Sequence, residues 1–275
     1  MPVFRFKHFA VSNSRSAMKV NTDGVLLGAL MTVTGRESHL LDVGTGTGSV
    51  ALMAAQRLSV ALYGTDGLFP ETASASSPDP GISIEAIDID QASADEASEN
   101  FSCSPWCGSM TACHQSLASF EDSLRVTRPS VRYDLVFSNP PYFESSLKAP
   151  DPRRRTARHA DTLSYRDLVS FAAEWLSDSG RLSMILPADL EREVRRYAVS
   201  MGMYPLRLVR IRTSPRRPCS RIVMEFSREG TSFCLPGGAM EAGPGHAPSE
   251  SVLTIMEEGT YSSEYRSLVS DFLFV

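Results

Sequence analysis

Short apolar runs alternate with helical patterns between His39 and Ser200, and this alternation limits the possible folds more than any other feature of the chain. The apolar runs lie at 39–43, 82–89, 133–138 and 180–187, and the helical patterns at 49–58, 91–101, 165–176 and 189–201. Such alternation is typical of βαβ units, in which helices cover the faces of a parallel sheet. The sequence therefore predicts an α/β fold.

The pattern changes after residue 201. Two apolar segments, 203–213 and 222–226, follow one another without a helix between them, which predicts an antiparallel pair at the sheet edge. A chain of 275 residues can form one such domain. The remaining expectations are a weak strand at 110–113, a strand at 252–256, a closing helix at 262–272, and surface loops at 65–81 and 236–248.

A glycine-rich turn follows the first predicted strand. Residues 42–48 read Asp-Val-Gly-Thr-Gly-Thr-Gly, and glycines here let a ligand approach backbone N–H groups closely. The spacing differs from the G-x-G-x-x-G of dinucleotide-binding folds, and an acid before the glycines suits a cation better than a diphosphate. We therefore expect Asp42, Gly44, Gly46 and Gly48 to bind S-adenosylmethionine, which carries a sulfonium and an ammonium group but no phosphate.

A carboxylate at the end of the second predicted strand is expected to bind the ribose of the same ligand. That strand ends in Asp88, and an acid in this place accepts hydrogen bonds from both ribose hydroxyls. Ile89 would pack on the adenine. The usual gap between the turn and this acid is about 20 residues, so Asp66 is a rival. Asp88 is preferred because a strand-like run precedes it and a helix follows, which makes 65–81 an insertion.

The tetrad Asn139-Pro140-Pro141-Tyr142 directly follows a predicted strand, at the end where open α/β sheets bind substrates. Two prolines make this turn stiff. An adenine N6 amine is a poor nucleophile because its lone pair is delocalised into the ring. If the Asn139 side-chain oxygen and the Pro140 carbonyl accept the amine hydrogens, the lone pair can point at a methyl donor while Tyr142 stacks on the base. The tetrad predicts catalysis by positioning and electrostatics, without a strong base.

Charge is distributed unevenly along this chain, whose net charge is −5. Residues 151–230 contain 16 Arg, no Lys and 10 acidic residues, a balance of +6, so the remaining residues carry −11. Such a segment is either a solvated face or an edge that binds a polyanion. Arg side chains suit phosphate oxygens. The candidate RNA contacts are Arg153, Arg154, Arg155 and Arg158, which follow the tetrad, and Arg216 and Arg217 in a second basic loop.

The sequence gives no indication of a metal site, a membrane span or a targeting segment. No apolar run reaches the roughly 20 residues that a membrane helix needs, and the first residues lack a signal-peptide stretch. The five cysteines form no C-x-x-C pair, which argues against a zinc knuckle or a disulfide framework. We therefore expect a cytoplasmic protein without a bound metal.

The N-terminal segment gives the sequence a specific resemblance. Residues 4–9 read FRFKHF and residues 17–29 read AMKVNTDGVLLGA. With 104–106, 139–143 and 157–159, these segments make the chain similar to the family of tRNA1(Val) adenine-37 N6-methyltransferases over nearly its whole length. The tetrad alone is shared with DNA adenine, rRNA guanine-N2 and protein glutamine methyltransferases, so it indicates only the type of nucleophile.

The resemblance implies a class I, Rossmann-like methyltransferase fold with a mostly parallel seven-stranded sheet, an antiparallel edge strand and helices on both faces. It implies that residues 1–38 form a lid and that 39–275 form the methyltransferase domain. In the lid, Lys19, Thr22 and Asp23 would lie over the cofactor pocket. Ser116 stands where many methyltransferases place an acid that binds the adenine amine of the cofactor.

The activity that the resemblance implies is methyl transfer from S-adenosylmethionine to N6 of an adenine in a tRNA anticodon loop. Such a base is single-stranded and can be splayed out at small cost. The alternatives are the same amino-methyl transfer to DNA adenine, rRNA guanine or protein glutamine, and a non-catalytic RNA-binding module. The intact tetrad and glycine turn argue against a loss of catalysis. Asp42 and the tetrad argue against a nicotinamide oxidoreductase.

Overall fold

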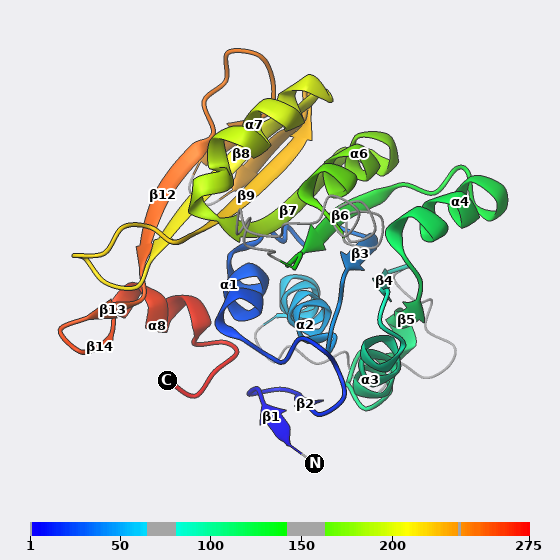
Figure 1. Cartoon of the computed structure of the whole chain (residues 1–275), viewed down its shortest axis with the longest axis horizontal. Helices are drawn as coiled ribbons and strands as arrows, with labels where there is room; N and C mark the ends of the chain where they lie inside the picture. Colours follow the sequence, from blue (N-terminus) through cyan, green and yellow to red (C-terminus); the bar gives the residue numbers. More distant parts are fainter. Residues whose placement is uncertain (1, 65–80, 142–162, 236–237) are drawn as a thin grey trace, which may run out of the picture.

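An eight-stranded mixed sheet forms the centre of the computed structural model, which describes residues 2–64, 81–141, 163–235 and 238–275 (Figure 1). The strand order is β12-β8-β9-β7-β6-β3-β4-β5. The strands are β3 (His39–Val43), β4 (Ser83–Asp88), β5 (Met110–His114), β6 (Tyr133–Ser138), β7 (Leu176–Pro187), β8 (Met203–Arg212), β9 (Arg221–Arg228) and β12 (Ser249–Thr254).

The sheet has the expected class I pattern with one strand added. Strands β5, β4, β3, β6 and β7 are parallel to one another, and β9 runs antiparallel to both β7 and β8. The expected number of seven is exceeded because β12 pairs in parallel with β8 over six residue pairs. This pairing uses backbone groups that β8 would otherwise expose at the sheet edge. The strand predicted at 252–256 therefore begins earlier, at Ser249.

Helices cover both faces of the sheet, as predicted. The larger hydrophobic cluster includes residues of α1, α2, α3 and α8, and a second cluster on the opposite face includes residues of α4, α6 and α7. The helices are α1 (Thr22–Leu30), α2 (Ser49–Tyr63), α3 (Gln91–Ser102), α4 (Leu117–Thr127), α6 (Tyr165–Trp175), α7 (Glu191–Ser200) and α8 (Ser263–Val269). The helix expected from 189 begins instead as a 3-10 turn at Ala188–Leu190 that leads into α7.

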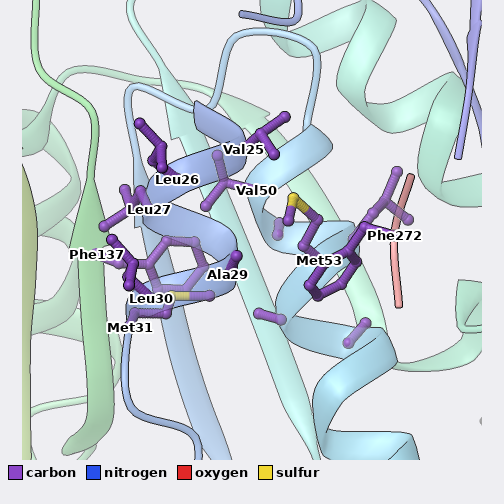
Figure 2. Packing of buried hydrophobic residues seen from close by; sticks show 14 of the residues in the cluster. Val25, Leu26, Leu27, Ala29, Leu30, Met31, Val50, Met53, Phe137 and Phe272 are labelled. Carbon is purple, nitrogen blue, oxygen red and sulfur yellow. The ribbon is translucent and has the colours of Figure 1, made fainter. Parts of the chain in front are cut away.

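Helix α1 packs closely against α2, and this contact brings the N-terminal region into the main core (Figure 2). A Cβ on Gly28 would lie 2.6 Å from the sulfur of Met53, so glycine is needed where the two helices approach. Leu26 and Leu27 of α1 are fully buried in the same cluster, which also contains Phe137 of β6. The start of α1 is therefore held at a fixed place beside the sheet.

The first strands form a hairpin whose aromatic side chains belong to the core. Strand β1 (Val3–Arg5) pairs antiparallel with β2 (Ala10–Ser12). Phe6 and Phe9 are buried and stacked, with ring centroids 4.4 Å apart, and Phe9 meets the buried Trp106 edge to face at 5.8 Å. These aromatic rings stabilise the hairpin against the rest of the core.

Residues 12–18, here called the N-terminal strap, run along α3 and are held by one buried carboxylate. Glu96 of α3 is completely buried. Burial alone would raise its pKa, but hydrogen bonds from the strap more than offset this and lower the pKa to about 2. The donors are the backbone amides of Ser14, Arg15 and Ser16 and the hydroxyls of Ser12 and Ser14, at 2.8 to 3.0 Å.

The loop predicted at 236–248 contains a strand, so that prediction was wrong for residues 238–241. Strand β10 (Ser232–Leu235) pairs antiparallel with β11 (Gly238–Glu241) in four residue pairs. Residues 236 and 237 lie outside the described residues. A further short hairpin joins β13 (Met256–Glu257) to β14 (Thr260–Tyr261). The predicted insertion at 65–81 lies, except for its last residue, outside the described residues.

Glu96→Gln should lower the free energy of unfolding at pH 7 by roughly 2 to 3 kcal/mol, because it removes the charge that the strap amides stabilise. The carboxylate of the parent has a lowered pKa in the folded state, so its stabilising contribution is complete above pH 4.5 and is lost as the pH falls towards 2. Urea unfolding between pH 2 and 7 measures both effects. The matched control is Glu99→Gln, since Glu99 lies on the same helix and makes only an exposed ion pair with Arg15. Equal losses in both variants would contradict the role given to Glu96.

Candidate active site

The carboxyl ends of β3, β4 and β6 meet at one edge of the sheet, where residues that follow β3 and β6 line a cleft. Strand β3 lies between β4 and β6, so the chain leaves β3 towards one side and later returns on the other. Open α/β sheets bind ligands at such a switch in strand order. The walls of the cleft are formed by Met18, Lys19, Asn21, Gly24, Asp42, Gly44, Thr45, Gly46, Thr47, Ser49, Val50 and Asn139.

The glycine turn between β3 and α2 needs glycine for both its conformation and its surroundings. Gly44, Gly46 and Gly48 have φ angles of 74°, 57° and 79°, a region that favours glycine. A Cβ on Gly46 would lie 3.3 Å from the carbonyl oxygen of Met18, and one on Gly48 would lie 2.5 Å from the ring of Phe101. The N-terminal strap therefore packs on the turn at Gly46, and α3 packs on it at Gly48.

Backbone amides of the glycine turn are hydrogen-bonded inside the protein. A diphosphate site would need such amides to point at the ligand. This arrangement supports the sequence-based preference for a cationic ligand over a nicotinamide dinucleotide. The amides of Gly44 and Thr45 donate to the Ile87 carbonyl, that of Gly46 donates to the Asp88 carboxylate, and that of Gly48 donates to the Thr45 carbonyl. The donor–acceptor distances are 2.8 to 3.1 Å.

Asp88 ends β4 and is tied directly to the glycine turn. One carboxylate oxygen accepts the amide of Gly46 at 2.8 Å, and the other accepts the amide of Asp90 at 2.9 Å. Burial raises the pKa of Asp88, and these two amides oppose the rise. The structure thus brings Asp88 to the turn, but Asp88 is not one of the residues of the cleft wall, and its binding to ribose stays a prediction. The rival Asp66 lies outside the described residues.

Asp42 lies buried beneath the turn, where it is close to a second acid. Its carboxylate accepts the Thr45 hydroxyl at 2.7 Å. Burial raises the pKa of Asp42 to about 7; the Thr45 hydrogen bond opposes this rise, and the charge of Asp88 adds to it. A cation in the cleft would favour the ionised form of both acids. The two carboxylates therefore fit a ligand that carries sulfonium and ammonium groups.

Asn139 directly follows β6 and forms the wall of the cleft opposite the glycine turn. Its side chain is 8% exposed. The hydroxyl of Ser138 donates to the Val43 carbonyl at 2.6 Å, so the end of β6 is joined to the end of β3. Nδ2 of Asn139 donates to the sulfur of Met18 at 3.6 Å, and Pro140 is buried next to it. Asn139 and the glycine turn therefore share one cleft.

Of the three residues that the resemblance places over the pocket, Lys19 lies in the cleft wall. Thr22 opens α1 with an exposed side chain. Asp23, in the first turn of the same helix, accepts Nε of Arg221 at 2.9 Å, which links α1 to the start of β9. Neither Thr22 nor Asp23 is part of the cleft wall described above.

Sequence reasoning missed seven residues of this wall, which are Met18, Asn21, Gly24, Thr45, Thr47, Ser49 and Val50. Asn21 caps α1, since its side-chain oxygen accepts the amide of Gly24 at 2.9 Å. An Asn before a helical pattern with an acid in its first turn is a recognisable capping signal. Nothing comparable marks Met18, because its contact with Asn139 spans 121 positions of the sequence.

Ile89 and Ser116 lie just beyond the ends of β4 and β5. Ile89 is 55% exposed, as an apolar surface that receives a ligand would be. Ser116 is half-buried and caps α4, where its hydroxyl accepts the amide of Ser119 at 3.2 Å. The amide of Gln115 donates to the Asp88 carbonyl at 2.8 Å, so the two strand ends are joined.

The loop 213–220, between β8 and β9, carries Arg216 and Arg217 with exposed side chains. Strand β8 runs in the same direction as β7, so this loop leaves the sheet at the edge that holds the cleft. The other predicted contacts lie outside the described residues; they are Tyr142, Arg153, Arg154, Arg155 and Arg158.

Two further properties concern only the part of the chain that the structure describes. Within it, no helix is long and apolar enough to cross a membrane. In the same residues, no group of three or more His, Cys, Asp or Glu side chains is arranged to hold a metal ion.

Comparison with known proteins identifies the family. No family model matches the sequence. The chain is 35% identical, over 271 residues, to tRNA1(Val) (adenine(37)-N6)-methyltransferase from Bacteroides fragilis, and the match covers 98% of this chain and 97% of that protein. The chain belongs to the tRNA1(Val) (adenine(37)-N6)-methyltransferase family. The resemblance inferred from the N-terminal segment and the tetrad is thereby confirmed.

Solved structures confirm the fold of this family member. A crystal structure from Agrobacterium tumefaciens, described as that of a predicted O-methyltransferase, aligns with a TM-score of 0.57 at 15% identity and covers 91% of this chain and 96% of that one. A crystal structure from Listeria monocytogenes, described as that of a putative class I S-adenosylmethionine-dependent methyltransferase, aligns with a TM-score of 0.50 at 11% identity, over 94% of this chain and 72% of that one. The family member is thus an S-adenosylmethionine-dependent methyltransferase with the class I fold.

Asp88→Asn should raise the dissociation constant for S-adenosylmethionine roughly ten- to 100-fold, because the lost charge weakens hydrogen bonds from both ribose hydroxyls. Isothermal titration calorimetry with the cofactor measures the change. The variant keeps the shape of the side chain and one acceptor for Gly46. The control is Asp66→Asn, which should bind as the parent does. If Asp66→Asn weakens binding and Asp88→Asn does not, the ribose acid has been assigned to the wrong strand.

Proposed function

We propose that this protein methylates N6 of adenine 37 in the anticodon loop of tRNA1(Val), with S-adenosylmethionine as the methyl donor. The observation that carries the proposal is the place of Asn139, which shares a cleft with the glycine turn across the β3–β6 switch. The acceptor follows the printed name of the Bacteroides fragilis relative. Together, a cofactor turn and an amide side chain suit methyl transfer to an exocyclic amine.

The catalytic task of the chain is to make this amine nucleophilic at the right place. S-adenosylmethionine supplies an electrophilic methyl group on its sulfonium. In our proposal Asn139 Oδ1 and the Pro140 carbonyl accept the two N6 hydrogens, which draws the nitrogen towards tetrahedral geometry. Its lone pair would then form the new bond to the methyl carbon while the bond from that carbon to sulfur breaks, the electron pair staying with S-adenosylhomocysteine. One N6 proton would leave to water. Positioning and electrostatic stabilisation supply the rate enhancement, and no strong base is required.

The residues proposed to bind the cofactor surround the glycine turn. Asp42 and Asp88 supply negative charge, and Ile89 and Ser116 lie where an adenine ring would extend beyond β4. Residues 1–38 are proposed to act as a cover for the methyltransferase domain 39–275, because Lys19 and its neighbours form one wall of the cleft. The proposed cofactor-binding residues are Lys19, Thr22, Asp23, Asp42, Gly44, Gly46, Gly48, Asp88, Ile89 and Ser116.

The tRNA is proposed to lie along the edge of the sheet that holds the cleft. A single-stranded anticodon-loop base can enter without the cost of opening a duplex, and Tyr142 would stack on it. Arg216 and Arg217 are exposed at the same edge and are suited to phosphate contacts. Arg153, Arg154, Arg155 and Arg158 would contribute further contacts beside the tetrad. A tRNA substrate of this kind is consistent with a cytoplasmic location.

Asn139→Ala should lower turnover on tRNA on the order of 100-fold or more, while the dissociation constant for S-adenosylmethionine changes little, because the amide acts on the acceptor amine in the transition state. Single-turnover kinetics and calorimetry measure the two quantities. An equal loss of cofactor binding would contradict the role given to Asn139.

The acceptor itself is tested by incubating the parent and Asn139→Ala separately with labelled cofactor and tRNA, rRNA, DNA or protein extract. Nuclease digestion and mass spectrometry then locate the label. We expect N6-methyladenosine at position 37 of tRNA1(Val) with the parent and none with the variant. Label only in DNA, rRNA or a protein glutamine would contradict the proposed acceptor.

The double substitution of Arg216 and Arg217 by Ala should weaken tRNA binding at low salt and flatten its salt dependence. Each lost phosphate contact should reduce the log–log slope by roughly 0.7 to 0.9. Filter binding at salt concentrations from about 50 to about 200 mM measures the slope. The triple substitution of Arg153, Arg154 and Arg155 by Ala is measured in the same way. Arg125→Ala is the control, since Arg125 of α4 is paired with Glu121 and Glu174. An unchanged slope in both test variants would mean that these arginines form a solvated face.

A further inference from the structure

Met18 of the N-terminal strap contacts both halves of the candidate site. Its carbonyl oxygen and Cβ lie 3.3 and 3.7 Å from the position that a Cβ on Gly46 would take. Its sulfur lies 3.6 Å from Nδ2 of Asn139. Met18 therefore joins the turn that binds the cofactor to the amide that acts on the acceptor.

The chemistry of the Met18 sulfur makes this contact directional. A thioether accepts hydrogen bonds weakly and donates none, whereas an amide has a donating end and an accepting end. Only the NH2 end of Asn139 can pair with the sulfur, and its oxygen then lies at the other end of the amide. In the reverse orientation the Asn139 NH2 group would face the N6 amine. Both groups present hydrogens, so the NH2 group could not accept a hydrogen bond from N6.

We propose that Met18 is a positioning residue, whose sulfur selects the orientation in which Asn139 Oδ1 faces the acceptor amine. The proposal rests on the proposed function, because it assumes that this oxygen accepts an N6 hydrogen. It adds to that function an orienting partner supplied by a segment outside the βαβ core.

The main chain around Met18 is fixed well enough for a weak acceptor to act in this way. The Ser16 hydroxyl donates to the Met18 carbonyl at 2.9 Å, and the Ser16 amide donates to Glu96 at 2.8 Å. The amide of Ala17 donates to the Ser93 hydroxyl at 3.3 Å. Methionine side chains are flexible, so a sulfur that must stay in one place needs a rigid backbone beneath it. The contacts with α3 supply that rigidity.

Two substitutions of Met18 separate the orienting role from simple packing. Met18→Leu keeps an apolar side chain of similar volume but removes the acceptor. Met18→Glu has a similar length and, when ionised, presents only accepting oxygens to Asn139. If Met18 orients the amide, kcat should fall roughly three- to tenfold in Met18→Leu and recover at least in part in Met18→Glu. If Met18 only fills space, Met18→Glu should be the more damaging change.

The measurements are kcat and KM on tRNA, the dissociation constant for S-adenosylmethionine, and the melting temperature. We expect the loss in Met18→Leu to fall on kcat, with cofactor binding and melting temperature close to those of the parent. In the Asn139→Ala background, Met18→Leu should cause no further loss, because there is no amide left to orient. Full activity of Met18→Leu, lower activity of Met18→Glu than of Met18→Leu, or additive losses in the double variant would each overturn the proposal.

The same set of variants shows which proposal has failed. If Asn139→Ala is as active as the parent, the proposed role of Asn139 is wrong, and that of Met18 falls with it. If Asn139→Ala is inactive and Met18→Leu is fully active, the proposed function stands and only the orienting role of Met18 is overturned.

Discussion

The carboxylate of Glu96 is the point at which the N-terminal strap is attached to the sheet domain. Five hydrogen bonds from the strap converge on it, three of them from consecutive backbone amides. A buried carboxylate is stable only when it accepts hydrogen bonds in this way. Without the Glu96 carboxylate, the strap amides that donate to it would lose their acceptor. The position of Met18 over Gly46, and with it one wall of the cleft, depends on this attachment.

Most of the fold could be predicted from the sequence because its signals are local. The apolar run 133–138 and the glycine turn at 44–48 are read from neighbouring residues, and both are found where they were expected. The edge strand β12 was placed late because it is held by pairing with β8, a distant part of the chain, and β11 was read as part of a loop. The number of strands therefore could not be fixed from local patterns.

The candidate site likewise has residues that local sequence patterns predict and contacts that such patterns do not record. Asp88 and Asn139 could be predicted because each directly follows a strand, and parallel strands carry such residues to a common edge. The contacts of Glu96 with the strap and of Met18 with Asn139 span 80 to 121 positions, and no local pattern records them. The sequence of α3, rich in Ala, Ser and Glu, gives no sign that Glu96 is buried and Glu99 exposed. Long-range hydrogen bonds are what the sequence alone leaves open.

The geometry between the two halves of the site is protected by the packing of the core. Strands β3 and β6 pair Asp42 with Phe137 and Leu41 with Val136. Phe137 belongs to the cluster on one face of the sheet and Val136 to the cluster on the other. A shift of the β3–β6 pairing by one residue would move each side chain to the opposite face of the sheet and disrupt the packing of both clusters. The register is therefore strongly specified. Because the glycine turn and Asn139 leave the ends of these two strands, the register also sets their separation. The distance on which methyl transfer depends is thus determined by hydrophobic contacts that never touch a substrate.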